Sequence, residues 1–141
     1  MTLADFVGLP FRDHGRDRTG ADCWGGVRMV LDELRGVVLP DYGSGYRETM
    51  DCDGIGASIR DGLVRDFVRV DKPQPFDLVI FNLAGKPWHV GVVVDACRFL
   101  HWPQPDARGN DGSSRIARLT DRMWKNRVEG FYRYKGEAHA G

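Results

Sequence analysis

Residues 20–36 read GADCWGGVRMVLDELRG, and this stretch carries the clearest periodic signal in the chain. Its apolar residues recur at i, i+3, i+4 and i+7, as Val27, Val30, Leu31 and Leu34. That spacing gathers them on one face of an amphipathic helix, which we predict over Cys23–Leu34. Asp22 is the expected N-cap and Gly36 the expected C-terminal stop.

Cys23 lies at the start of this predicted helix, where backbone N–H groups lack partners and the macrodipole is positive. Both features favour the thiolate, so we predict a pKa below the usual value of about 8.5 and a reactive thiol. The alternative is a small buried side chain without chemistry. Cys52, in an acidic loop, and Cys97, in a turn, lack this context, and we interpret both as incidental.

A thiol nucleophile needs a base, which is usually histidine. The chain has four histidines: His14, His89, His101 and His139. His89 opens the predicted strand HVGVVVD, and His101 ends the next one, RFLH. Because the start of one strand and the end of its antiparallel neighbour share a sheet edge, we expect these imidazoles side by side. A Cys–His–His set of nucleophile, base and orienting residue follows. His14, in a polar loop, and His139, in the tail, are weaker candidates.

The order of elements predicts an α+β fold. We expect a short helix ending near Gly8, a polar loop over 12–22 and one or two short helices over 47–60. Runs of β-branched and aromatic residues predict strands at 64–70, 76–83, 88–96, 98–102, 115–119 and 128–134, with 76–83 and 88–96 as a hairpin. Helices followed by an antiparallel meander are typical of the α+β class, here as a single domain over 1–141.

Composition excludes several classes of protein. Twenty basic and twenty acidic residues give zero net charge, which argues against a sequence-independent nucleic-acid binder. No apolar run approaches the roughly 20 residues of a membrane span, and the N-terminus lacks a signal-peptide pattern, so we expect synthesis in the cytoplasm. Three widely spaced cysteines suggest neither a disulfide framework nor a zinc site, and no metal or cofactor is indicated.

At this point the motifs resemble those of the NlpC-type cell-wall cysteine peptidases, which have a papain-like fold. The matching stretches are GADCWGGVRMVLDELRGVVLPDY, PFDLVIF, HVGVVVD and RFLHW. The D-C-W-G motif and the following L-P-x-Y turn, residues 39–42, are closest to the subgroup encoded in phage-tail and gene-transfer-agent clusters. The resemblance covers about 6–134, leaves 135–141 as a flexible tail, and implies N-terminal helices packed on a central antiparallel sheet.

Carried over residue by residue, the resemblance assigns Cys23 as nucleophile, His89 as general base and His101 as orienting residue. Asp22 matches an acidic residue that shapes the site. Further residues expected to shape the site or contact substrate are Trp24, Gly25, Phe11 and Trp88; for the two tryptophans a role as core or rim aromatics is favoured over direct substrate contact. The chain departs from the family at Phe11, where many members have tyrosine, at Gly26, where leucine is frequent, and at Phe76, where glycine is usual.

The implied reaction is hydrolysis of peptidoglycan stem peptides, with the bond between D-glutamyl and the diamino acid favoured. The implied partners are tail-tip or baseplate proteins of a phage-like particle, which would deliver the enzyme to the cell wall or periplasm. The long polar loop 103–114 is a candidate contact for them; the alternative is a mobile surface loop. Two other functions stay open: a structural tail component without catalysis, and an amidase or acyltransferase of the same superfamily.

Overall fold

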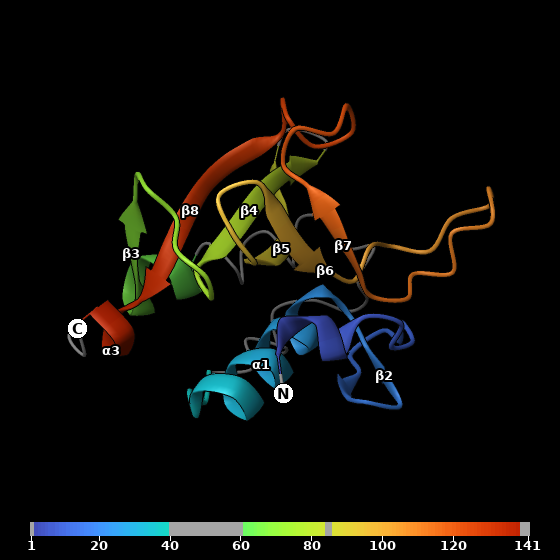
Figure 1. The fold of residues 1–141 in the computed structure, drawn as a ribbon, viewed down its shortest axis with the longest axis horizontal. Coiled ribbons are helices and arrows are strands. Elements are labelled where there is room, and N and C mark those ends of the chain that lie inside the picture. The colour runs from blue at the N-terminus through green and yellow to red at the C-terminus, as the bar shows by residue number, and fades with distance from the viewer. Residues whose placement is uncertain (1, 40–60, 84–85, 139–141) are drawn as a thin grey trace.

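The computed structural model describes residues 2–39, 61–83 and 86–138 (Figure 1). Its helical segments are a 3-10 helix η1 (Leu3–Phe6), the main helix α1 (Cys23–Arg35), residues 61–66 and a short helix α3 (Lys135–Ala138). The strands are β1 (Arg16–Asp17), β2 (Gly20–Ala21), β3 (Phe67–Val70), β4 (Leu78–Leu83), β5 (Lys86–Val93), β6 (Arg98–His101), β7 (Arg115–Arg118) and β8 (Val128–Tyr134). Within these ranges no helix has the length and apolar character that a bilayer span requires.

Six of the strands form one antiparallel sheet in the order β3-β8-β4-β5-β6-β7. Strands β4 to β7 follow one another as a meander, whereas β8 returns to pair with both β3 and β4. Strands β1 and β2 make a separate two-stranded ribbon near α1. Figure 1 shows α1 and the ribbon on one side of the sheet, which confirms the predicted α+β class and its helices packed on a central sheet.

Helix α1 forms as its sequence predicts. The Asp22 side chain caps its first turn, and Gly36 ends it in the left-handed conformation, with φ 65°. Its apolar face is buried against β5 and β6, the strands that carry the two predicted site histidines. The first turn of α1 is thereby fixed against the middle of the sheet.

The two faces of the sheet are covered differently. Side chains alternate along a strand, so Val90 and Val92 of β5 enter the core shared with α1, as does Leu100 of β6. The opposite face carries a second, smaller apolar cluster. Its buried members are Val79, Phe81, Val93, Phe99 and Trp124. The sheet therefore separates a helix side from an aromatic side.

Several details differ from the sequence prediction. The expected loop 12–22 contains the ribbon β1–β2, because Arg16 and Asp17 pair with Ala21 and Gly20. Residues 61–66 are helical, so the strand predicted from residue 64 begins only at Phe67. The first four residues of the expected flexible tail form α3. The hairpin turn predicted over 84–87 is shorter, because β5 begins at Lys86 and pairs there with Leu83. The predictions for Cys52, the helices over 47–60, the turn residues 40–42 and residues 84–85 fall outside the described residues.

Phe76, at a position where the family resemblance implies glycine, adopts a left-handed backbone with φ 76°. This conformation costs a non-glycine residue about 1–2 kcal/mol. The Arg35 guanidinium lies 4.8 Å from the centre of the Phe76 ring, a contact that offsets part of that cost.

The next residue, Asp77, is buried and receives two 2.8 Å hydrogen bonds from Arg133, which ties the start of β4 to β8.

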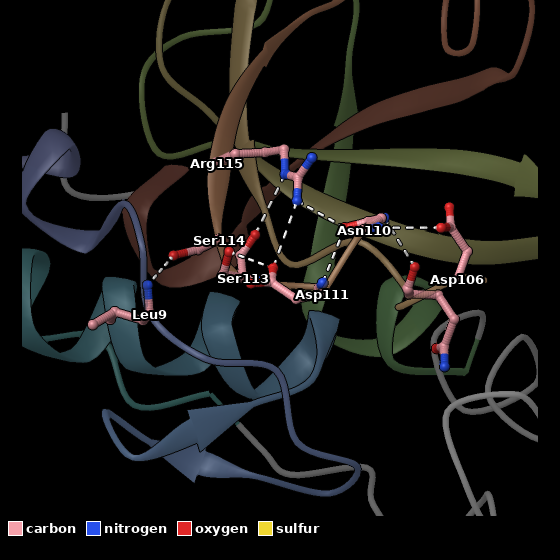
Figure 2. A network of polar contacts seen from close by, with 9 residues as sticks. Leu9, Asp106, Asn110, Asp111, Ser113, Ser114 and Arg115 are labelled. Carbon is pink, nitrogen blue, oxygen red and sulfur yellow. Dashed lines mark hydrogen bonds and ion pairs between the residues drawn. The ribbon is translucent and has the colours of Figure 1, made fainter. Parts of the chain in front are cut away.

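Hydrogen bonds hold the second half of the polar loop 103–114 at two residues, Asn110 and Ser114 (Figure 2). Ser114 is buried; its backbone bonds to Gly8 and Leu9, and its hydroxyl accepts a hydrogen bond from Leu9 N–H and donates one to the Phe6 carbonyl. Asn110 accepts hydrogen bonds from Gly112 N–H and from the Arg115 guanidinium. The contacts of Ser114 anchor the second half of the loop to the N-terminal segment of the chain.

The close approach of helix and sheet generates a prediction at Gly26. A Cβ atom built there would overlap the Trp102 ring. Gly26→Ala should therefore lower the free energy of unfolding by about 1–2 kcal/mol, because overpacking outweighs the helix propensity that alanine adds. Urea denaturation measures this. The same substitution in a Trp102→Val background should cost little, and stabilisation by Gly26→Ala in the wild-type background would contradict the packing described.

Candidate active site

The Asp22 carboxylate is fully buried at the start of α1. Its Oδ1 accepts hydrogen bonds from Gly25 N–H at 2.8 Å and from Arg16 Nη1 at 2.9 Å, and its Oδ2 accepts one from His14 N–H at 3.1 Å. The predicted cap is confirmed, whereas the donors from Arg16 in β1 and from His14 in the preceding loop are not predicted by any local sequence pattern. Arg16 also balances the buried charge.

Cys23, the next residue, is 2% exposed and lies beside β5. Burial raises the pKa of the thiol well above its usual value, and the neighbouring Asp22 charge raises it further. Hydrogen bonds from the backbone of Val90 and Trp24 and the charge of Arg16 act in the opposite direction but are outweighed. The predicted low pKa is therefore wrong, because helix position alone does not reveal a buried, acidic neighbourhood. At neutral pH this thiol carries its proton.

His89 and His101 lie in direct contact, as their strand positions predict. His89 Nε2 is 2.8 Å from His101 Nδ1, and both rings are almost completely buried. Burial lowers the pKa of His89 to about 3. The pKa of His101 is also well below its usual value, first through burial and then through the nearby charges of His89 and Arg115. Both imidazoles are neutral at pH 7, which leaves a ring nitrogen able to accept a proton.

Aromatic rings enclose this pair, and Trp124 is the member that the sequence did not single out. Its ring stacks on His89, with centroids 5.2 Å apart and planes at 21°, and it meets His101 edge-on at 5.2 Å. Phe81 and Phe99 complete the enclosure. Trp124 lies between β7 and β8, so only the folded sheet brings it to the histidines. The enclosure explains why both imidazoles are held in the neutral form.

The other predicted site residues are distributed unevenly. Gly25 lies in the first turn of α1, where a Cβ atom would collide with the Gly15 carbonyl. Trp24 is 3% exposed and belongs to the core rather than to an open surface. Phe11 is half-buried, bridges to Ala21 and packs against the core. The side chain of Trp88 is outside the described part of the structure.

The burial of Cys23 makes this thiol a slower target for alkylation than the exposed Cys97. Iodoacetamide at near-neutral pH should modify the exposed Cys97 before the buried Cys23 in the folded protein, since the thiolate reacts and must be accessible. Peptide mass spectrometry at successive times distinguishes the two sites. In urea their rates should become similar. Labelling of Cys23 as fast as Cys97 in folded protein would contradict the buried, protonated thiol.

The buried imidazoles make stability depend on pH. Their pKa values are lower in the folded than in the unfolded chain, so the unfolded chain binds more protons below about pH 6.5. Stability should therefore fall as pH decreases from 7 to 5, approaching about 1.4 kcal/mol per pH unit for each histidine. Urea unfolding at several pH values should show a shallower slope for His89→Gln than for wild type. Equal slopes would contradict the neutral, buried His89.

The chain is similar to known proteins in sequence. It is 28% identical over 124 residues to the murein DD-endopeptidase MepS/murein LD-carboxypeptidase of Escherichia coli K12, covering 88% of this chain and 55% of that enzyme. It is 25% identical over 108 residues to Protein P54 of Enterococcus faecium, covering 77% of this chain and 18% of that protein. The chain thus spans about half the length of the first relative and under a fifth of the second.

Solved structures share its fold. The NlpC/p60 domain of the peptidoglycan hydrolase SagA superposes with a TM-score of 0.61 at 18% identity, over 92% of this chain and 90% of that one. An NlpC/P60 family protein from Bacillus cereus gives a TM-score of 0.68 at 23% identity, over 94% of this chain and 37% of that one. The model of the NlpC/P60 family matches residues 8–133, and the chain belongs to this family.

Proposed function

We propose that this chain is a cysteine peptidase that hydrolyses peptidoglycan stem peptides. The proposed roles are Cys23 as nucleophile, His89 as general base and His101 as the residue that orients His89. The observation that carries the proposal is the 2.8 Å contact between two buried imidazoles on β5 and β6, strands that contact α1, together with the hydrogen bond to Cys23 from the backbone of Val90, the neighbour of His89. Family membership and similarity to a murein endopeptidase support the substrate class.

The histidine contact supports one direction of proton transfer. If Nδ1 of His89 accepts the thiol proton, Nε2 of His89 carries the other proton and donates it to Nδ1 of His101. His101 then holds the ring and tautomer of His89 without itself taking the proton. Since both rings are neutral at pH 7, the base is already in the form that can accept a proton.

The chemical step follows from these roles. As His89 takes the proton, the sulfur of Cys23 bonds to the substrate carbonyl carbon, and N–H groups at the start of α1 stabilise the oxyanion. The imidazolium then gives its proton to the amide nitrogen, the C–N bond breaks and a thioester remains. Water, deprotonated by His89, attacks the thioester, and the leaving sulfur recovers a proton. Because the thiol begins protonated, we expect proton transfer and sulfur attack to be coupled.

The bond cleaved and the route to the wall are further parts of the proposal. The resemblance of the D-C-W-G and L-P-x-Y motifs to the phage-tail and gene-transfer-agent subgroup supports cleavage between D-glutamyl and the diamino acid. It also supports delivery by a phage-like tail tip, whose proteins would contact the exposed part of loop 103–114. Action at the cell wall is consistent with family membership.

Digestion of purified peptidoglycan tests the proposal. Wild-type protein should release cleaved stem peptides, identified by mass spectrometry, and Cys23→Ala should release none. His89→Gln should be inactive, whereas His101→Gln should retain partial activity, because an amide oxygen can still accept the His89 N–H. Circular dichroism should confirm that each variant is folded.

Other outcomes point elsewhere. Cleavage that persists in Cys23→Ala would overturn the assignment of the nucleophile. A joined product on addition of an acceptor amine would indicate acyl transfer. Absence of any cleavage together with the chain present in purified phage-like particles would indicate a structural tail component. Particles that lack the chain would overturn the delivery proposal.

A further inference from the structure

A groove of about 470 Å³ borders the imidazole pair on its His101 side. Two of its lining residues, His101 and Trp124, are buried and also form the contacts around His89. The other walls come from β7, the loop that precedes it and the turn before β8. A molecule in this groove would therefore lie alongside His101, whose ring contacts the proposed base His89.

One wall of the groove carries a guanidinium that is already held in place. Arg115 stands at the start of β7, and its Nη2 donates a 2.7 Å hydrogen bond to Asn110 Oδ1, while Asp111 lies 4.0 Å away (Figure 2). Asn110 is fixed in turn by Gly112 N–H. The positive charge of Arg115 acts on the imidazole pair, because it helps to lower the pKa of His101.

A second guanidinium, Arg122, lines the groove from the turn before β8. Within residues 2–39, 61–83 and 86–138, its side chain makes no hydrogen bond or ion pair. The one carboxylate in the lining, Asp121, accepts a hydrogen bond from the Arg118 backbone. The lining thus holds two cations and one anion, and since Asp111 lies beside Arg115, Arg122 is the cation whose donors are not used by any residue that the structure describes.

The chemistry of the lining selects an anionic ligand. A guanidinium offers two parallel N–H donors that match a carboxylate. Met123, 62% exposed in the same lining, provides an adaptable apolar contact for the carbon chain that bears the carboxylate. We propose that this groove binds a carboxylate-bearing part of the acidic peptide substrate, with Arg122 as the main contact and Arg115 in support. This inference rests on the proposed peptidase function.

Carboxylate and carboxamide forms of the same substrate test the inference. We would compare soluble stem peptides in which each free carboxylate in turn is replaced by its amide. For wild type, amidation of one particular carboxylate should lower kcat/KM about tenfold, mainly through KM. Arg122→Gln should lose a similar factor on the acidic peptide and should no longer distinguish it from that amide.

Arg118→Gln is the matched control, since Arg118 is an exposed arginine of the same strand β7 that does not line the groove. It should distinguish acid from amide as wild type does. Arg122→Gln and Arg115→Gln proteins that retain wild-type discrimination would overturn the proposal. Binding of the same peptide pairs to the Cys23→Ala protein, measured by calorimetry, does not depend on turnover. A preference for the acid that disappears with Arg122→Gln would support the groove even if no peptide were cleaved; equal binding of acid and amide would reject it.

Discussion

The buried Asp22 carboxylate is the interaction on which the rest of the site depends. A charge without solvent must be matched by donors, and three segments supply them: the first turn of α1 through Gly25, the ribbon through Arg16 and the preceding loop through His14. His14 adopts φ 58°, the conformation that brings its N–H to the carboxylate. One side chain thus fixes where α1 begins, and with it the position of the Cys23 sulfur.

The same carboxylate has a chemical consequence. A negative charge beside Cys23 opposes the helix dipole, and burial adds to its effect, so the thiol stays protonated. Burial acts on His89 in the opposite sense and keeps it neutral. The Cys23 thiol and the His89 imidazole are therefore both uncharged in the folded protein at pH 7. Such a site differs from a preformed thiolate–imidazolium pair, because separation of charge would have to accompany attack on the substrate.

The sequence predicts those parts of the site that are formed by residues close together in the chain. Helix α1 follows from local periodicity and caps, and the contact between His89 and His101 follows from two strands joined by a short turn, which must be antiparallel neighbours. The ion pair between Asp77 and Arg133 and the stacking of Trp124 join residues from distant parts of the chain, and no local pattern encodes them. The pKa of Cys23 was misjudged for the same reason, since burial is a property of the assembled fold.

The assembled molecule explains both glycines in the first turn of α1: Gly25, which belongs to the D-C-W-G motif, and Gly26, where the family resemblance implies leucine. Gly25 and Gly26 weaken the first turn of α1, at a cost of about 1 kcal/mol each relative to alanine. At Gly25 the missing side chain admits the Gly15 carbonyl, next to Arg16. At Gly26 it admits the ring of Trp102, the residue that follows His101. The turn that bears Cys23 is therefore approached from one side by the ribbon that neutralises Asp22 and from the other by Trp102, which directly follows strand β6 and His101. The two glycines lower the helix propensity of this turn but allow the Gly15 carbonyl and the Trp102 ring to approach it closely. The Trp102 ring fills the space that a side chain at position 26 would occupy.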